Sequence, residues 1–144
     1  MSLDCVVDAS VGIKLFLIES LSERADALFA HLTDDAPAQF YVPDLFFVEC
    51  TNVLWKYARH FGYPVEDACQ DVTDLTSLPL RVVSTAELAV EALKIAVIHD
   101  ITPYDAAYVA LSEYLSLPLV TADEALVHRL AGRSFEVRWL GAWP

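Results

Sequence analysis

Four carboxylates stand at places in the chain from which they could act together on one substrate. Asp8 and Asp123 each follow a short apolar run that has the character of a buried strand, while Asp105 opens a helical segment and Glu49 lies inside another. Like charges gathered at one place repel one another and raise pKa values unless a cation is present. Ligation by oxygen alone suits Mg²⁺ or Mn²⁺ better than zinc. The four residues therefore favour a divalent-ion site of the kind that activates water for hydrolysis.

Each carboxylate also has an ordinary structural explanation. Asp8 and Asp123 are in positions where they could cap the N-termini of the helices that follow, and Asp105 could complete a capping arrangement with Thr102. Glu49 could belong to a solvated helix face. A shared site requires instead that the elements of the fold bring all four to one edge of a sheet.

Helical projection separates Glu49 from the apolar face of its own segment. At about 100° per residue, Glu49 falls in line with polar residues, and the projected apolar stripe lies elsewhere. The polar line contains Asn52, Lys56 and His60, and the apolar stripe contains Phe47, Leu54, Ala58 and Phe61. We therefore expect Glu49 to lie outside the core, on a polar ridge.

Short apolar strands alternate with helical segments along the chain. The expected strands are 3–7, 40–42, 80–83, 119–120 and 135–140, and the expected helices are 9–18, 21–32, 43–60, 65–75, 84–98, 102–117 and 124–130. A capping box, Ser84 with Glu87, opens one helix, and Thr102 followed by Pro103 opens another. This order predicts an α/β fold with a mainly parallel sheet and helices on both faces, in one domain spanning 1–144. Parallel strands place their carboxyl ends, and a ligand site, at one edge.

The composition excludes several classes of protein. Hydrophobic residues make up 56% of the 144 positions, which excludes disorder, and the net charge of -12 disfavours ordinary nucleic-acid binding. Charges interrupt every apolar stretch, and the N-terminus lacks signal-peptide features, so we expect no membrane association and a cytoplasmic location. The three cysteines are expected to be buried free thiols, and the scattered histidines predict no zinc site.

Four segments make the sequence familiar. VVDAS, PDLFFVECTNVLWK, TPYDAAYVALSEYLSLPLVTAD and the closing FEVRWL occur in order and span nearly the whole chain. Together they resemble the PIN-domain family, and most closely the VapC-like toxins of bacterial and archaeal toxin-antitoxin pairs. The third segment is the most specific of the four.

The resemblance implies a three-layer α/β/α domain that cleaves RNA phosphodiester bonds with one or two divalent ions, Mg²⁺ or Mn²⁺. Asp8, Glu49, Asp105 and Asp123 match the family's acidic quartet. Thr121 matches a hydroxyl residue that often precedes the last acid, and Ser10 and Asn52 fall at positions that are commonly polar. The family also implies a small antitoxin that obstructs the site, and a toxin that forms a homodimer.

The basic residues nearest in sequence to the four acids are candidate phosphate contacts. They are Lys14, Lys56 and Arg59, each of which could equally belong to a solvated helix face. Because the chain has so few basic side chains, we expect weak non-specific affinity for RNA. Recognition would then depend on metal bridging, local basic residues and RNA shape.

Two other classes of function compete with a metal-dependent endoribonuclease. A receiver-like signalling domain needs a Lys after a late strand, and the segments after Val83, Val120 and Leu140 contain none. A non-catalytic PIN-like binding module would use an apolar surface for its partner. Ile13, Phe16, Leu17, Leu28, Phe29 and Leu32 could supply that surface, or could simply pack on the sheet.

Overall fold

A parallel sheet forms the centre of the molecule. The computed structural model describes residues 3–143, and over that range it contains five strands in the order β3-β2-β1-β4-β5, every pair parallel. The strands are β1 (Cys5–Val7), β2 (Phe40–Pro43), β3 (Arg81–Val83), β4 (Leu119–Thr121) and β5 (Val137–Trp139). Because all five run in one direction, the residues that follow them gather at a single edge of the sheet.

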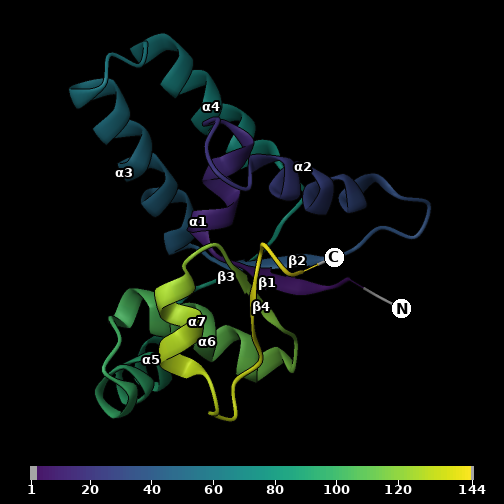
Figure 1. The fold of residues 1–144 in the computed structure, drawn as a ribbon, viewed down its shortest axis with the longest axis vertical. Coiled ribbons are helices and arrows are strands. Elements are labelled where there is room, and N and C mark those ends of the chain that lie inside the picture. Colours follow the sequence, from purple (N-terminus) through teal and green to yellow (C-terminus); the bar gives the residue numbers. More distant parts are fainter. Residues whose placement is uncertain (1–2, 144) are drawn as a thin grey trace.

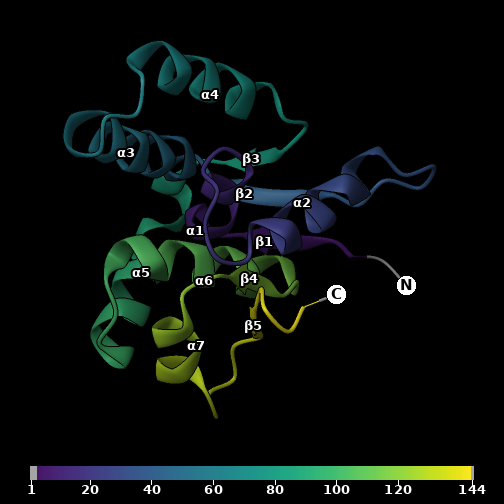
Figure 2. The same ribbon diagram turned by 45° about the horizontal axis from the view of Figure 1, so that its top comes forward.

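Helices cover both faces of the sheet, which confirms the three-layer α/β/α architecture (Figure 1). The α-helices are α1 (Ala9–Gly12), α2 (Ser22–Ala30), α3 (Leu45–His60), α4 (Val65–Ser77), α5 (Thr85–His99), α6 (Pro103–Leu115) and α7 (Glu124–Leu130). The first three lie on one side, with α4 beyond α3, and α5 to α7 lie on the other (Figure 2). The paired helices α3 and α4 project from the body of the domain.

The first predicted helix is much shorter than the expected 9–18. It ends at Gly12 and continues as a 3-10 turn over Ile13–Leu15. Gly12 packs against the buried ring of Phe46, and a Cβ at this position would come within 2.5 Å of that ring. The absence of a side chain at Gly12 therefore lets the end of α1 pack closely against the start of α3.

Gly12→Ala should destabilise the fold without touching any carboxylate. The added methyl group overlaps the Phe46 ring, and overpacking of this kind costs about 1–3 kcal/mol of unfolding free energy. Chemical denaturation measures the loss. In the Phe46→Leu background the same substitution should cost less, and equal costs in both backgrounds would contradict the packing argument.

Most of the apolar residues that could have formed a partner surface are inside the protein. Ile13, Leu17, Leu28 and Phe29 are buried in the core, while Phe16 and Leu32 are partly buried against it. These two segments therefore pack on the sheet, as the simpler of the two explanations proposed. They therefore do not supply the partner surface that a non-catalytic binding module would need.

Two further local predictions are wrong. Cys5 and Cys50 are buried free thiols as expected, but Cys69 is exposed, because the face of α4 that packs on the protein is the one with Ala68 and Leu75. The capping box at Ser84 is also not formed within the described residues. Instead the Asp44 carboxylate accepts hydrogen bonds from the main-chain N–H and the hydroxyl of Thr85, so that the residue following β2 secures the start of α5.

None of the helices within residues 3–143 combines the length and the apolar character needed to cross a lipid bilayer.

Candidate active site

All four sequence-predicted carboxylates line one cleft at the carboxyl edge of the sheet. The cleft has a volume of about 620 Å³. Its floor and walls come from the ends of β1 and β4 and from the starts of α1, α3 and α6. The residues that line it are Asp8, Ala9, Ser10, Leu45, Val48, Glu49, Asn52, Val53, Tyr104, Asp105 and Asp123.

Asp8 is the most deeply placed of the four, with 6% of its surface exposed. Its Oδ2 accepts hydrogen bonds from the Thr121 hydroxyl at 2.7 Å and the Ser10 hydroxyl at 2.9 Å. Ser10 in turn accepts from the main-chain N–H of Ala122 at 3.0 Å. Burial raises the pKa of Asp8, and the two hydroxyls offset part of that rise. Asp8 is thus oriented by a hydroxyl network rather than used as a side-chain cap for α1.

Glu49 lies outside the core and lines the cleft together with Asn52, as the polar ridge predicted, but it is half-buried rather than solvated. Its Oε1 accepts a 2.6 Å hydrogen bond from the hydroxyl of Tyr108, a residue of α6. Desolvation, with smaller contributions from the charges of Asp8 and Asp105, raises the pKa of Glu49 to about 7. Burial and the neighbouring acids raise the pKa of Tyr108 as well, so its hydroxyl stays protonated and donates.

The projected apolar stripe on α3 was only partly right, since Leu54 is buried but Phe46 and Cys50 accompany it in place of Phe47 and Phe61. The buried residues of α3 are Phe46, Cys50 and Leu54, whereas Phe61, just after the helix, is 73% exposed. The helix contacts the sheet only near its start, and its second half extends beyond the body of the domain (Figure 1). Residues near Phe61 therefore have little core to face, and the stripe that includes Phe46 brings Glu49 to the cleft.

Asp105 combines a site position with the predicted helix start. Thr102 caps α6 by accepting from the main-chain N–H of Asp105 at 3.2 Å, which leaves the carboxylate itself to line the cleft. Desolvation, followed by the charges of Asp8 and Asp123, raises the pKa of Asp105 to about 6. The predicted Thr102 cap is confirmed.

Asp123 has both of the roles considered for it. Its Oδ1 accepts hydrogen bonds from the main-chain N–H groups of Ala125 at 3.0 Å and Leu126 at 3.3 Å, and so caps α7. The same carboxylate lines the cleft. The cap fixes where this acid stands relative to Asp105.

The three basic residues expected near the site lie elsewhere. Over the described residues, the cleft lining includes no Lys, Arg or His. Lys14 is 11% exposed at its side chain and forms a 3.0 Å ion pair with Glu19, five residues on. Lys56 and Arg59 are exposed on the projecting part of α3, where Arg59 borders a separate apolar hollow. Closeness in sequence to an acid therefore did not predict closeness in space.

Tyr104 and Tyr108 are functional candidates that the sequence reasoning missed. Tyr104 is exposed and lines the cleft, and Tyr108 holds Glu49. Tyr108 is three residues after Asp105 on α6, so the two share a helix face. That spacing is a signal that could have identified Tyr108, but its partner Glu49 is 59 residues away in sequence.

The donor chemistry of the cleft fits a hard divalent cation. Four carboxylates supply oxygen ligands only, and the pKa values of three of them are raised by burial and, for Glu49 and Asp105, by neighbouring negative charge. In the side-chain conformations present within residues 3–143, no three Asp, Glu, His or Cys side chains are close enough together to hold an ion. Side-chain rotation of the less constrained acids would be needed to close around one.

Tyr108→Phe should impair the site while leaving the fold in place. The hydrogen bond from Tyr108 holds Glu49 in place and keeps the pKa of Glu49 lower than burial alone would make it. Without that bond we expect about 10- to 100-fold lower activity, as for other lost supporting contacts at metal sites. The acidic limb of the pH profile should also move to higher pH. Tyr63→Phe is the matched control, because Tyr63 donates to Asp71 far from the cleft. Equal activity in the two variants would contradict this role.

Known proteins share this sequence and fold. The PIN domain model matches residues 5–132. Ribonuclease VapC3 of Pyrobaculum aerophilum is 34% identical over 126 residues, which are 86% of this chain and 92% of that protein. The crystal structure of PAE2754 from the same organism is 26% identical with a TM-score of 0.68, covering 98% of this chain and 93% of that one.

Two more distant structures share the fold. A toxin-antitoxin complex from Klebsiella pneumoniae is 15% identical with a TM-score of 0.65, over 94% of this chain and 96% of that one. Mycobacterium tuberculosis VapC20, described as a sarcin-ricin loop cleaving toxin, is 21% identical with a TM-score of 0.68, over 94% and 99%. By its sequence and its fold, this chain belongs to the PIN domain family, among its VapC-like members.

Proposed function

We propose that this protein is a divalent-metal-dependent endoribonuclease, the toxin of a toxin-antitoxin pair, and that Asp8, Glu49, Asp105 and Asp123 form its catalytic site. The observation that carries the proposal is the convergence of these four acids, from distant parts of the chain, in one cleft. The 34% identity to a ribonuclease supports RNA as the substrate.

Asp8 and Asp105 are the principal candidates to hold the cation, Mg²⁺ or Mn²⁺. Asp8 is buried and oriented by Ser10 and Thr121, and Asp105 faces it across the cleft from the first turn of α6. When bound, the cation polarises the scissile phosphate and favours ionisation of the attacking water. Asp123, fixed by its cap on α7, completes the acidic lining.

Glu49 is suited to take up the proton that the attacking water loses. Its pKa of about 7 lets it exchange a proton near neutral pH, and Tyr108 holds its Oε1 in place. Among the described residues no histidine lines the cleft, so this carboxylate is the group there best matched to such a role.

The proposed partners follow from the relatives. A solved relative of the same fold is a toxin-antitoxin complex, which supports a small antitoxin as the partner of this chain. A homodimer, a cytoplasmic location and a single domain over 1–144 remain predictions. Copurification from the native host should recover this antitoxin as a short protein with a basic segment.

Cleavage of a panel of structured RNAs by the purified protein tests the proposal. We expect internal cleavage with Mg²⁺ or Mn²⁺, and none with excess chelator. Since water rather than the 2′-hydroxyl is the nucleophile, a 2′-O-methyl group at the cleavage site should leave the reaction in place. A protein that binds the cation and RNA without cutting any RNA of the panel would instead be the non-catalytic module.

A further inference from the structure

A second hollow adjoins the catalytic cleft. Its volume is about 250 Å³, and it is lined by Asp100, Ile101, Thr102, Asp105, Asp123, Ala125, Leu126 and Arg129. Asp105 and Asp123 line both spaces. The cleft and the hollow therefore adjoin at these two carboxylates, and a strand laid over the acids would pass from one to the other.

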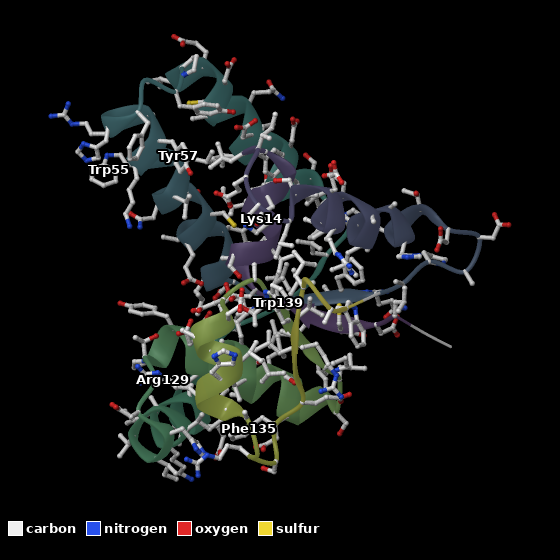
Figure 3. The ribbon with its side chains drawn as sticks, viewed as in Figure 1. Lys14, Trp55, Tyr57, Arg129, Phe135 and Trp139 are labelled. Atoms are coloured by element: carbon white, nitrogen blue, oxygen red, sulfur yellow. The ribbon has the colours of Figure 1, made fainter. Side chains whose placement is uncertain are left out.

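Arg129 gives this second hollow a chemistry that the cleft lacks. Among the described residues that line the cleft or the hollow, Arg129 is the single basic residue. It belongs to α7, on the side of that helix facing α5, and on the opposite side of the sheet from Lys14 (Figure 3). The positive charge thus stands beside the acids from a direction that the sequence did not indicate.

The guanidinium of Arg129 is held in position and remains accessible. Its Nη1 donates to the main-chain oxygen of Asp100 at 2.7 Å and lies 3.6 Å from the Asp100 carboxylate. The side chain of Arg129 is 56% exposed. A guanidinium has five N–H donors in a planar fork, so one anchored nitrogen orients the group while leaving donors that suit a phosphate.

A basic side chain close to the acids would have a specific use in this protein. The net charge of -12 repels a polyanion, and within the described residues the cleft contains no basic group. We infer that Arg129 binds a backbone phosphate of the RNA strand next to the one that is cleaved, and so fixes how the strand crosses Asp105 and Asp123. This inference rests on the proposed ribonuclease function.

The competing structural role is that Arg129 only secures the end of α5. Asp100 follows that helix in a left-handed conformation, and a basic side chain on its carbonyl is a common way to end a helix. A helix-ending role predicts lower thermal stability on substitution and no specific effect on RNA binding. The two roles are therefore separable by measurement.

The test compares Arg129→Gln and Arg129→Lys with Arg133→Gln, a matched control on an exposed residue that lines neither space. With a short single-stranded RNA that the wild type cleaves, Arg129→Gln should raise KM about tenfold or more with little change in kcat. Arg129→Lys should restore part of the loss. The slope of log KM against log salt should decrease by about 0.7, the value for one phosphate contact on a single strand.

Substrates with one neutral methylphosphonate linkage identify the phosphate. At one position beside the scissile bond, the neutral linkage should weaken wild-type binding and add nothing further in Arg129→Gln. If Arg129→Gln matches Arg133→Gln in KM and salt slope while the wild type cleaves RNA, the inference is overturned and the proposed function stands. If the wild type cleaves no RNA, the proposed function itself fails, and the inference with it.

Discussion

Asp8→Asn should reduce RNA cleavage by about 10³-fold or more, with no loss of folding stability. The buried carboxylate is the best-oriented of the proposed cation ligands. Removing its charge should forfeit several kcal/mol of electrostatic assistance, at about 1.4 kcal/mol per tenfold change in rate. Cleavage kinetics with Mg²⁺ give the first quantity, and chemical denaturation of the same preparation without metal gives the second.

The stability half of this prediction follows from the direction of the pKa shift. The pKa of Asp8 is raised by burial, so the folded chain holds its proton more tightly than the unfolded chain does. Stability therefore falls as pH rises above the ordinary pKa of 3.8, and ionisation of the buried Asp8 is a cost to the folded state. Asn removes that cost, so the variant should be at least as stable as the wild type.

Asp44→Asn is the matched control. Asp44 also follows a strand at the same sheet edge, but it lies outside the cleft lining and bonds Thr85. Its pKa is lowered, chiefly by the Thr85 hydroxyl, so its ionised form is favoured in the folded state. We expect a small loss of stability and unchanged cleavage. If Asp8→Asn were instead the less stable and still active variant, the assignment of Asp8 would be wrong.

Divalent ions should stabilise the protein strongly at pH 8 and weakly at pH 5. Binding at a cation concentration of 100 times Kd contributes about 2.7 kcal/mol. Burial raises the pKa of Glu49 to about 7 and that of Asp105 to about 6, so protons occupy these ligands as pH falls through that window. Thermal unfolding with and without Mg²⁺ or Mn²⁺ across this range measures the effect.

The same shifts set the pH dependence of the metal-free protein. Both acids have folded-state pKa values above their ordinary values of 4.5 and 3.8, so the folded chain binds more protons between about pH 4 and 7. Stability without metal should therefore decrease as pH rises through this window. Asp105→Asn should flatten part of that decrease. An equal shift on adding the cation at pH 5 and pH 8 would contradict the placement of these acids in its site.

The part of the site that depends on strand ends could be predicted from sequence. Asp8 and Asp123 follow buried strands, and in a parallel sheet that alone brings them to one edge. Asp105 could be placed as well, because Thr102 and Pro103 mark the start of its helix. The same local signals predicted the order of the strands and helices that the structure contains.

The remaining features depend on packing between distant segments. The buried stripe of α3, and with it the partial burial of Glu49, was missed because α3 extends beyond the sheet (Figure 1), so an apolar residue such as Phe61 stays exposed. Tyr108 meets Glu49 only because α6 and α3, from opposite faces of the sheet (Figure 2), come together at its carboxyl edge, and Arg129 reaches the acids through α7. Lys14 forms an ion pair with Glu19 instead of lining the cleft, and this pairing depends on the turn of the chain after α1.

The direct test of a metal-assisted ribonuclease in this cleft is cleavage of an RNA with sulfur in place of one non-bridging oxygen at the scissile phosphate. Mg²⁺ binds sulfur poorly, while softer divalent ions such as Mn²⁺ or Cd²⁺ tolerate it better. We predict that the sulfur substitution slows cleavage with Mg²⁺ and that Mn²⁺ or Cd²⁺ restores it, with Asp8→Asn inactive in every ion. Equal slowing in all ions, or cleavage by the Asp8 variant, would contradict the account.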